Sequence, residues 1–446
     1  MLTAVTLGFA VVQLDVSVVN VAVRAIGSGL GGGVGGVQWV VDAYTLTFAA
    51  FILSAGGLGD RIGARRVLIG GFALFTVASV ACGAAPSIGF LVAARAVQGI
   101  GAAALGACSL ALLNHSFPGP AARARAIAVW AAGGSASMAA GPVAGGLLIA
   151  VAGWRSIFLI NVPLGAAGIW LTARYARETN RARDRGVDLP GQAAAVVMLS
   201  ALAGATIEVG SRGLLAPLVL AGYAIAVLSG VAFAVVEARR ARPMLPMTLF
   251  RSGEFRVTVI VGPLINVVFY GLFFSVSLFV QRQDRLSPRA TGLAFVPVLA
   301  AVMGGNFAVR RVAGIRGPGV AGALLMAIGC AGLAAADSVS GLARLAATGS
   351  MVAALAVTGL GIGLIVPVIT AALLGSVDPA FSGIASGTLT AMRQAGSVVG
   401  VALFGSLLAS QGAVNGLRAG CAAGVGLALL VGGLSASLPR SGSRSG

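Results

Sequence analysis

The chain has 446 residues, of which 58% are hydrophobic and only 9% are charged. Its mean hydropathy is +0.99, well above that of a soluble domain, in which about half of the residues are apolar and about a quarter are charged. The formal net charge of +18 comes from 30 basic residues, all of them Arg. They form short clusters between apolar runs, which indicates membrane topology and argues against a nucleic-acid-binding domain. Since a Walker A motif requires Lys, the sequence also contains no P-loop ATPase.

Apolar runs long enough to cross a bilayer, about 17 to 25 residues each, recur along the whole chain. The sequence predicts an all-α integral membrane protein with about fourteen transmembrane helices. The predicted spans cover approximately residues 1–23, 38–58, 67–85, 88–113, 126–150, 157–173, 189–207, 214–236, 257–280, 291–309, 320–336, 345–377, 383–410 and 419–438.

The distribution of Arg predicts the orientation of these spans. Twenty Arg residues fall in the loops after even-numbered spans and in the C-terminal tail, eight fall in the opposite loops, and Arg95 and Arg393 lie within spans. Because basic loops stay in the cytoplasm, both termini are expected there. We therefore expect a multi-pass protein of the cell inner (cytoplasmic) membrane.

Two polar stretches divide the chain into a 6 + 2 + 6 arrangement. We expect an N-terminal six-helix bundle, a cytoplasmic linker, an inserted helix pair, a cytoplasmic loop, a C-terminal six-helix bundle and a cytoplasmic tail. These parts cover residues 1–173, 174–188, 189–236, 237–256, 257–438 and 439–446 respectively.

The loop after the second predicted span reads GGLGDRIGARR and carries a specific signature. Its defined positions are Gly56, Asp60, Arg61, Gly63, Arg65 and Arg66, and they match G-x-x-x-D-R-x-G-x-R-R, the loop signature of the major facilitator superfamily. Gly63 suits a tight turn, and Asp60 can hold a neighbouring helix end or an Arg in one of two conformations. The alternative is a merely basic cytoplasmic loop.

The first two predicted spans contain two acids. The segment Leu14 to Ala22 resembles the LD-x-T-x-VN-x-A signature of the fourteen-span drug:H⁺ antiporter family, with Ser17 in place of Thr, and QWVVDAYTL (38–46) is similar to that family too. An ionisable residue in hydrocarbon is a functional candidate by default, so Asp15 and Asp42 are candidates for proton coupling or substrate binding. The alternative is a structural pair with Arg95. Glu208 is kept as a further candidate acid.

Two further tracts extend the resemblance. Arg95 opens RAVQGIGAA, which looks like the fourth-span signature of the superfamily; a buried Arg stays charged and can bias a nearby carboxylate, although a purely structural role is equally open. In the fifth span, a face of small residues resembles the antiporter signature G-x-x-x-G-P-x-x-G-G, with Ser in place of the first Gly, and it permits close helix packing. Its residues are Gly133, Ser137, Gly141, Pro142, Gly145 and Gly146.

The resemblance runs from Leu14 to Arg393 and implies a major facilitator fold with alternating access. It implies proton-coupled efflux of small hydrophobic or cationic compounds such as antibiotics, by a protein that functions as a monomer. The expected partners are the small-molecule substrate, protons and the lipid bilayer, with no nucleic acid. The proton gradient supplies the energy, and no cofactor or metal is expected.

Three alternatives remain open. The first is a uniporter or importer of a metabolite without proton coupling, and the second is a non-transporting membrane sensor or assembly protein. The third, a membrane enzyme, is disfavoured because His115 is the only histidine and the four cysteines form no CxxC pair or zinc spacing.

Overall fold

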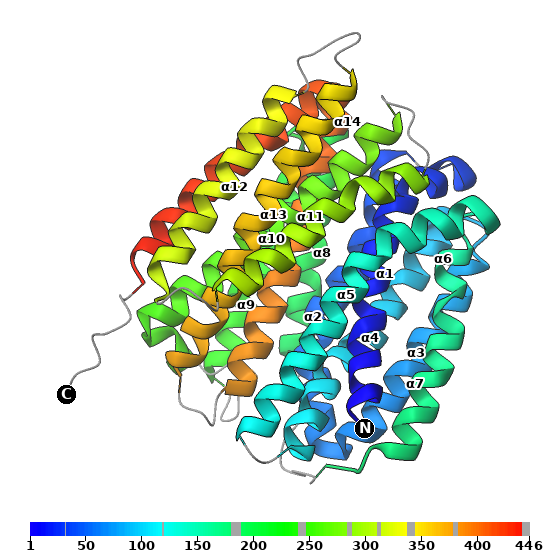
Figure 1. Cartoon of the computed structure of the whole chain (residues 1–446), viewed down its shortest axis with the longest axis vertical. Helices are drawn as coiled ribbons and strands as arrows, with labels where there is room; N and C mark the ends of the chain where they lie inside the picture. The colour runs from blue at the N-terminus through cyan, green and yellow to red at the C-terminus, as the bar shows by residue number, and fades with distance from the viewer. Residues whose placement is uncertain are drawn as a thin grey trace. The chain divides into compact units, whose positions relative to one another are not determined.

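A computed structural model describes residues 1–31, 33–117, 120–179, 189–239, 247–282, 288–309, 314–336, 344–377 and 382–438. All secondary structure in these ranges is helical (Figure 1). Helices suit a chain of this composition because a helix satisfies its own backbone hydrogen bonds where no water is available. The prediction of an all-α membrane protein is confirmed.

The helices follow one another along the chain with these bounds. They are α1 (Leu2–Leu30), α2 (Val34–Ile62), α3 (Ala64–Gly83), α4 (Ile88–Ser116), α5 (Pro120–Ala152), α6 (Ser156–Leu159), α7 (Asn161–Tyr175), α8 (Leu189–Arg212), α9 (Pro217–Arg239), the 3₁₀ helix η1 (Met247–Arg251), α10 (Gly253–Arg282), α11 (Pro288–Ala308), α12 (Arg316–Ala336), α13 (Arg344–Gly375) and α14 (Ser382–Ala436).

Within the described residues, thirteen helical runs are long and apolar enough to cross a membrane. The last of them belongs to α14, whose 55 residues contain a break at Gly412, with φ 79° and ψ 173°. A continuous helix of that length would measure roughly 80 Å, more than twice the thickness of a bilayer core. The break at Gly412 therefore separates two spans, in agreement with about fourteen.

The chain forms two compact units, and the first comprises Met1–Ala205, Leu220–Pro246 and Leu286–Leu293. Within it, α1 packs against α5 and α4, α2 packs against α4, and α3 packs against α4 and α7. The early spans are therefore arranged around α1 and α4, the two helices that carry Asp15 and Arg95.

The second unit comprises Thr206–Val219, Met247–Arg285 and Ala294–Gly446. Its principal contacts join α10 to α14, α12 to α13 and α12 to α14. The expected division of the chain into six, two and six helices remains a prediction. Most of the expected linker 174–188, the middle of the expected loop 237–256 and the expected tail 439–446 lie outside the described residues.

Several helices extend beyond the predicted spans. Because α1 continues to an αL cap at Gly31 (φ 71°), Asp15 lies midway along it. The signature 56–66 is not a loop: α2 runs to Ile62 and α3 starts at Ala64, so that only Gly63 (φ 107°) lies between them. This φ favours glycine, as the prediction of a tight turn at Gly63 requires.

Candidate functional site

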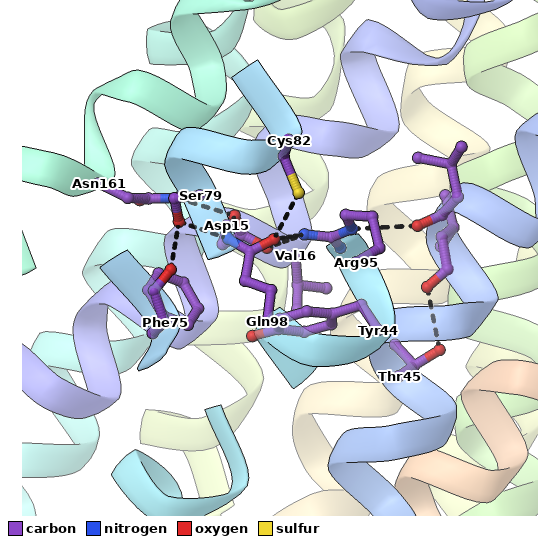
Figure 2. Close-up of polar contacts among 12 residues, drawn as sticks. Asp15, Val16, Tyr44, Thr45, Phe75, Ser79, Cys82, Arg95, Gln98 and Asn161 are labelled. Atoms are coloured by element: carbon purple, nitrogen blue, oxygen red, sulfur yellow. Dashed lines mark hydrogen bonds and ion pairs between the residues drawn. The ribbon is translucent and has the colours of Figure 1, made fainter. Parts of the chain in front are cut away.

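A buried cluster of polar side chains surrounds Asp15 within the first unit (Figure 2). Arg95 Nη1 donates to Asp15 Oδ2 at 2.5 Å, while Gln98 Nε2 and Asn161 Nδ2 donate to Asp15 Oδ1 at 2.9 and 3.0 Å. Asp15 and Arg95 are each only 1% exposed. The carboxyl of Asp15 thus receives three hydrogen bonds, from residues of α4 and α7.

The rest of the cluster holds these donors in place. Ser79 Oγ of α3 accepts from Gln98 Nε2 at 2.8 Å and from Asn161 Nδ2 at 3.3 Å, and its own hydroxyl donates to the carbonyl of Phe75 at 2.8 Å. Arg95 Nη1 also donates to Gln98 Oε1 at 2.7 Å. Residues of four helices, α1, α3, α4 and α7, are therefore joined through one carboxylate.

Arg95 also contacts α2. Its Nε donates to the carbonyl of Val40 at 3.0 Å, and its Cζ lies 4.2 Å from the centroid of the Tyr44 ring. An aromatic face attracts a guanidinium, most strongly where water is excluded. The contacts connect α2 to the cluster and leave Arg95 paired with Asp15.

Asp42 of α2 lies in a different environment, although the sequence groups it with Asp15. It is fully buried, and neither of its carboxyl oxygens has a hydrogen-bond partner among the residues that the structure describes. A buried charge without a partner is costly, by far more than a buried neutral group. The two candidate acids are therefore chemically distinct.

Glu208 lies near the end of α8. Arg212 Nε donates to Glu208 Oε2 at 2.7 Å in an i,i+4 pair, and the Glu208 side chain is 38% exposed. Exposed pairs of this kind contribute little to stability. Glu208 belongs to the second unit, whereas Asp15 and Asp42 belong to the first.

The small-residue face of α5 packs on α1 around Asp15. A Cβ added at Gly141 would overlap Ser17 Oγ and lie 2.8 Å from Ser17 Cβ, and one added at Gly145 would lie 3.1 Å from Val18 Cγ1. At Gly133, an added Cβ would overlap the side chain of Thr6. The backbones of α5 and α1 approach closely because these positions lack side chains.

The signature at the α2–α3 junction contacts the segment that follows α7. Glu178 Oε1 accepts from the backbone N–H of Arg65 at 2.9 Å, and Thr179 Oγ1 accepts from the N–H of Ala64 at 3.0 Å. These N–H groups belong to the first turn of α3, where no intrahelical acceptor exists. Arg66 Nε lies 3.7 Å from Glu178 Oε2, which adds an exposed ion pair.

Sequence reasoning did not identify Gln98, Asn161, Ser79 and Glu178 as site residues. Gln98 follows Arg95 by three positions on one helix, a spacing that places both on the same face. This spacing could have identified Gln98 as a site residue. Asn161 and Ser79 come from other spans, and no local pattern brings them to Asp15. Glu178 lies in a polar linker, where acids are ordinary.

Helical spans with an ion pair and polar side chains buried in their interior are typical of polytopic membrane proteins that bind or move a solute or an ion. Residues 5–401 match the family model described as the Major Facilitator Superfamily. The chain belongs to the major facilitator superfamily.

Two curated relatives and one solved structure are similar over nearly all of the chain. The methylenomycin A resistance protein of Streptomyces coelicolor is 39% identical over 98% of this chain and 91% of its own length. The multidrug resistance protein Stp of Mycobacterium tuberculosis is 36% identical over 92% of this chain and 75% of its own. The xylose transporter XylE of E. coli, 16% identical, matches with a TM-score of 0.65 over 100% of this chain and 97% of its own.

Proposed function

We propose that this protein exports small hydrophobic or cationic compounds from the cytoplasm in exchange for protons, and that it functions as a monomer without a cofactor. The relatives named for resistance to methylenomycin A and to multiple drugs support export. The observation that carries proton coupling is the pair of buried acids, one neutralised by Arg95 and the other without a partner among the described residues.

The two acids take different parts in this proposal. Asp42, which has no partner among the described residues, carries its proton in this conformation, because a bare charge there is too costly. Asp15 is paired with Arg95 and also accepts hydrogen bonds from Gln98 and Asn161. A proton that reaches Asp15 weakens its pairing with Arg95, and the contacts among four helices rearrange with it.

The energy of such an exchange is adequate. A proton that moves down a membrane potential of about 100 mV supplies roughly 2.3 kcal/mol. That energy supports an approximately fifty-fold gradient of the exported compound for each charge moved.

A transport assay tests the proposal directly. The protein is reconstituted in liposomes with an imposed pH gradient, and movement of ethidium is followed by fluorescence. We expect the gradient to drive ethidium accumulation in the parent and in Glu254→Gln, an acid outside the cluster, and we expect Asp42→Asn to lose the gradient-driven component.

The same assay distinguishes the alternative of a uniporter or importer without proton coupling. A uniporter equilibrates ethidium at the same rate with and without the pH gradient, and Asp42→Asn leaves that rate unchanged. Equal rates with and without the gradient in the parent would reject proton-coupled export, and an Asp42→Asn variant that keeps the gradient-driven component would reject Asp42 as the coupling acid.

A further inference from the structure

Arg393 is a second cation within a membrane span, half-buried in α14 of the second unit. Its Nε donates to Asn266 Oδ1 of α10 at 3.3 Å, and Asn266 Nδ2 donates back to the Arg393 carbonyl at 2.8 Å. Asn266 Nδ2 also donates to Ser397 Oγ at 3.1 Å. The amide thus holds the α10–α14 contact in register, but it brings no negative charge to the guanidinium.

Among the described residues of the second unit, no acid forms an ion pair with Arg393. The predicted spans between residues 257 and 438 contain no Asp or Glu at all, and in the described part of the chain no ion pair includes Arg393. Glu254 lies twelve residues before Asn266 in α10, a distance of roughly 18 Å along the axis. Glu208 already pairs with Arg212. Arg95, in contrast, is neutralised by Asp15.

A small apolar cavity of about 10 Å³ lies between α10, α11 and α13, and its lining does not include Asn266 or Arg393. Phe269 and Phe273 follow Asn266 by three and seven positions, the spacing of one helix face, and both line the cavity together with Phe295 and Thr358. The rings of Phe273 and Phe295 have centroids 4.0 Å apart. Aromatic side chains therefore lie about one and two turns beyond Asn266 along α10.

We propose that Arg393 and Asn266 form a recognition site for an anionic group, such as a carboxylate, on the transported compound. A guanidinium is always charged and presents a planar set of donors that matches a carboxylate, and an anion supplies the negative charge that the neutral amide of Asn266 does not. The inference rests on the proposed export function and adds organic anions to its substrates.

Binding to the purified full-length protein tests the site without any transport. The probes are 4-phenylbutyrate and its neutral analogue 4-phenylbutanamide, which share shape and differ in charge, and dissociation constants are measured by calorimetry at fixed pH and salt. We expect the parent to bind the carboxylate more tightly than the amide, because only the carboxylate gains charge-assisted bonds to Arg393.

Two variants remove that advantage in different ways. Arg393→Gln deletes the charge, and Asn266→Asp keeps Arg393 but supplies an internal carboxylate as its partner. Each should weaken phenylbutyrate binding about 10- to 100-fold, the range for a hydrogen bond to a charged group, and leave binding of the amide unchanged. The matched control is Arg418→Gln, an exposed Arg of the same helix α14, which should bind both probes like the parent.

The binding results test the anion site, and they can be distinguished from a failure of the export function. The proposal would be overturned if the parent bound neither probe, or bound both equally. It would also be overturned if the Asn266→Asp variant eluted as a folded species and bound phenylbutyrate like the parent. If Arg393→Gln fails to fold, Asn266→Asp decides alone. Loss of ethidium export with carboxylate preference intact would reject only the export function, and the reverse result would reject only the anion site.

Discussion

At the scale of single residues, the two buried acids show how strongly surroundings determine chemistry. Asp15 and Asp42 are both carboxyls in apolar helices, but Asp15 receives three donors and pairs with Arg95, whereas Asp42 has no partner among the described residues. Removing one member of a buried ion pair leaves its partner as an uncompensated charge, which costs about 3 to 5 kcal/mol. Replacing Asp42 leaves no uncompensated charge among the described residues, because neither of its carboxyl oxygens has a partner there.

The stability of two matched variants follows from this difference. Asp15→Asn should lower the midpoint of thermal unfolding markedly, because the Arg95 charge is left buried. Asp42→Asn should leave the midpoint close to that of the parent, because the amide replaces an acid without a described partner. Thermal unfolding of both variants in the same detergent checks this, and equal midpoints would contradict the roles assigned to the two acids.

At the scale of elements, the position of α3 depends on a segment distant in sequence. Its first-turn N–H groups are capped by Glu178 and Thr179, which follow α7. The Glu178 carboxylate lies directly over Gly63, where an added Cβ would overlap it. The glycine of the signature therefore serves both the φ of the turn and the approach of this cap.

A native thiol reports on this cap. Cys108 of α4 is buried, and its Sγ lies against Gly59, four residues before Gly63. Glu178→Ala should loosen the α2–α3 junction by about 1 kcal/mol, the typical value of a helix cap, and so raise the alkylation rate of Cys108 about five-fold. The measurement uses a protein in which Cys82, Cys330 and Cys421 are replaced.

Glu178→Gln is the conservative control for this experiment. It keeps an acceptor oxygen for the Arg65 N–H and loses only the exposed ion pair with Arg66, which contributes little. Its alkylation rate should stay near that of the parent. Equal rates in Glu178→Ala and the parent would show that the contact does not hold the junction.

At the scale of the whole molecule, the Arg distribution predicts the sidedness of the loops. Arg177 lies in the segment after α7 and Leu215 in the turn between α8 and α9, and both side chains are exposed. In intact cells, an impermeant thiol reagent should label Leu215→Cys and spare Arg177→Cys, in a background without native cysteines. Labelling of Arg177→Cys from outside would reverse the proposed orientation.

Much of the architecture was predictable from the sequence because hydrocarbon imposes simple rules. Runs of apolar residues had to form helices, and their number agrees with the described helices once α14 is divided at Gly412. Helix ends were less predictable. The signature at 56–66 contains charged residues and was assigned to a loop, but α2 and α3 include all of it except Gly63, because the N–H groups of Ala64 and Arg65 are capped by residues after α7.

The sequence by itself determined that the chain spans a membrane, how many times it does so, and which side chains carry charge within the spans, since hydropathy and residue type are local properties. Only the tertiary structure decided the relations among those charges. It paired Asp15 with Arg95 across α1 and α4, added Asn161 from α7, left Asp42 without a described partner, and placed Arg393 beside the neutral amide of Asn266. These relations depend on helix packing between residues up to 146 positions apart, and no local periodicity encodes which faces meet.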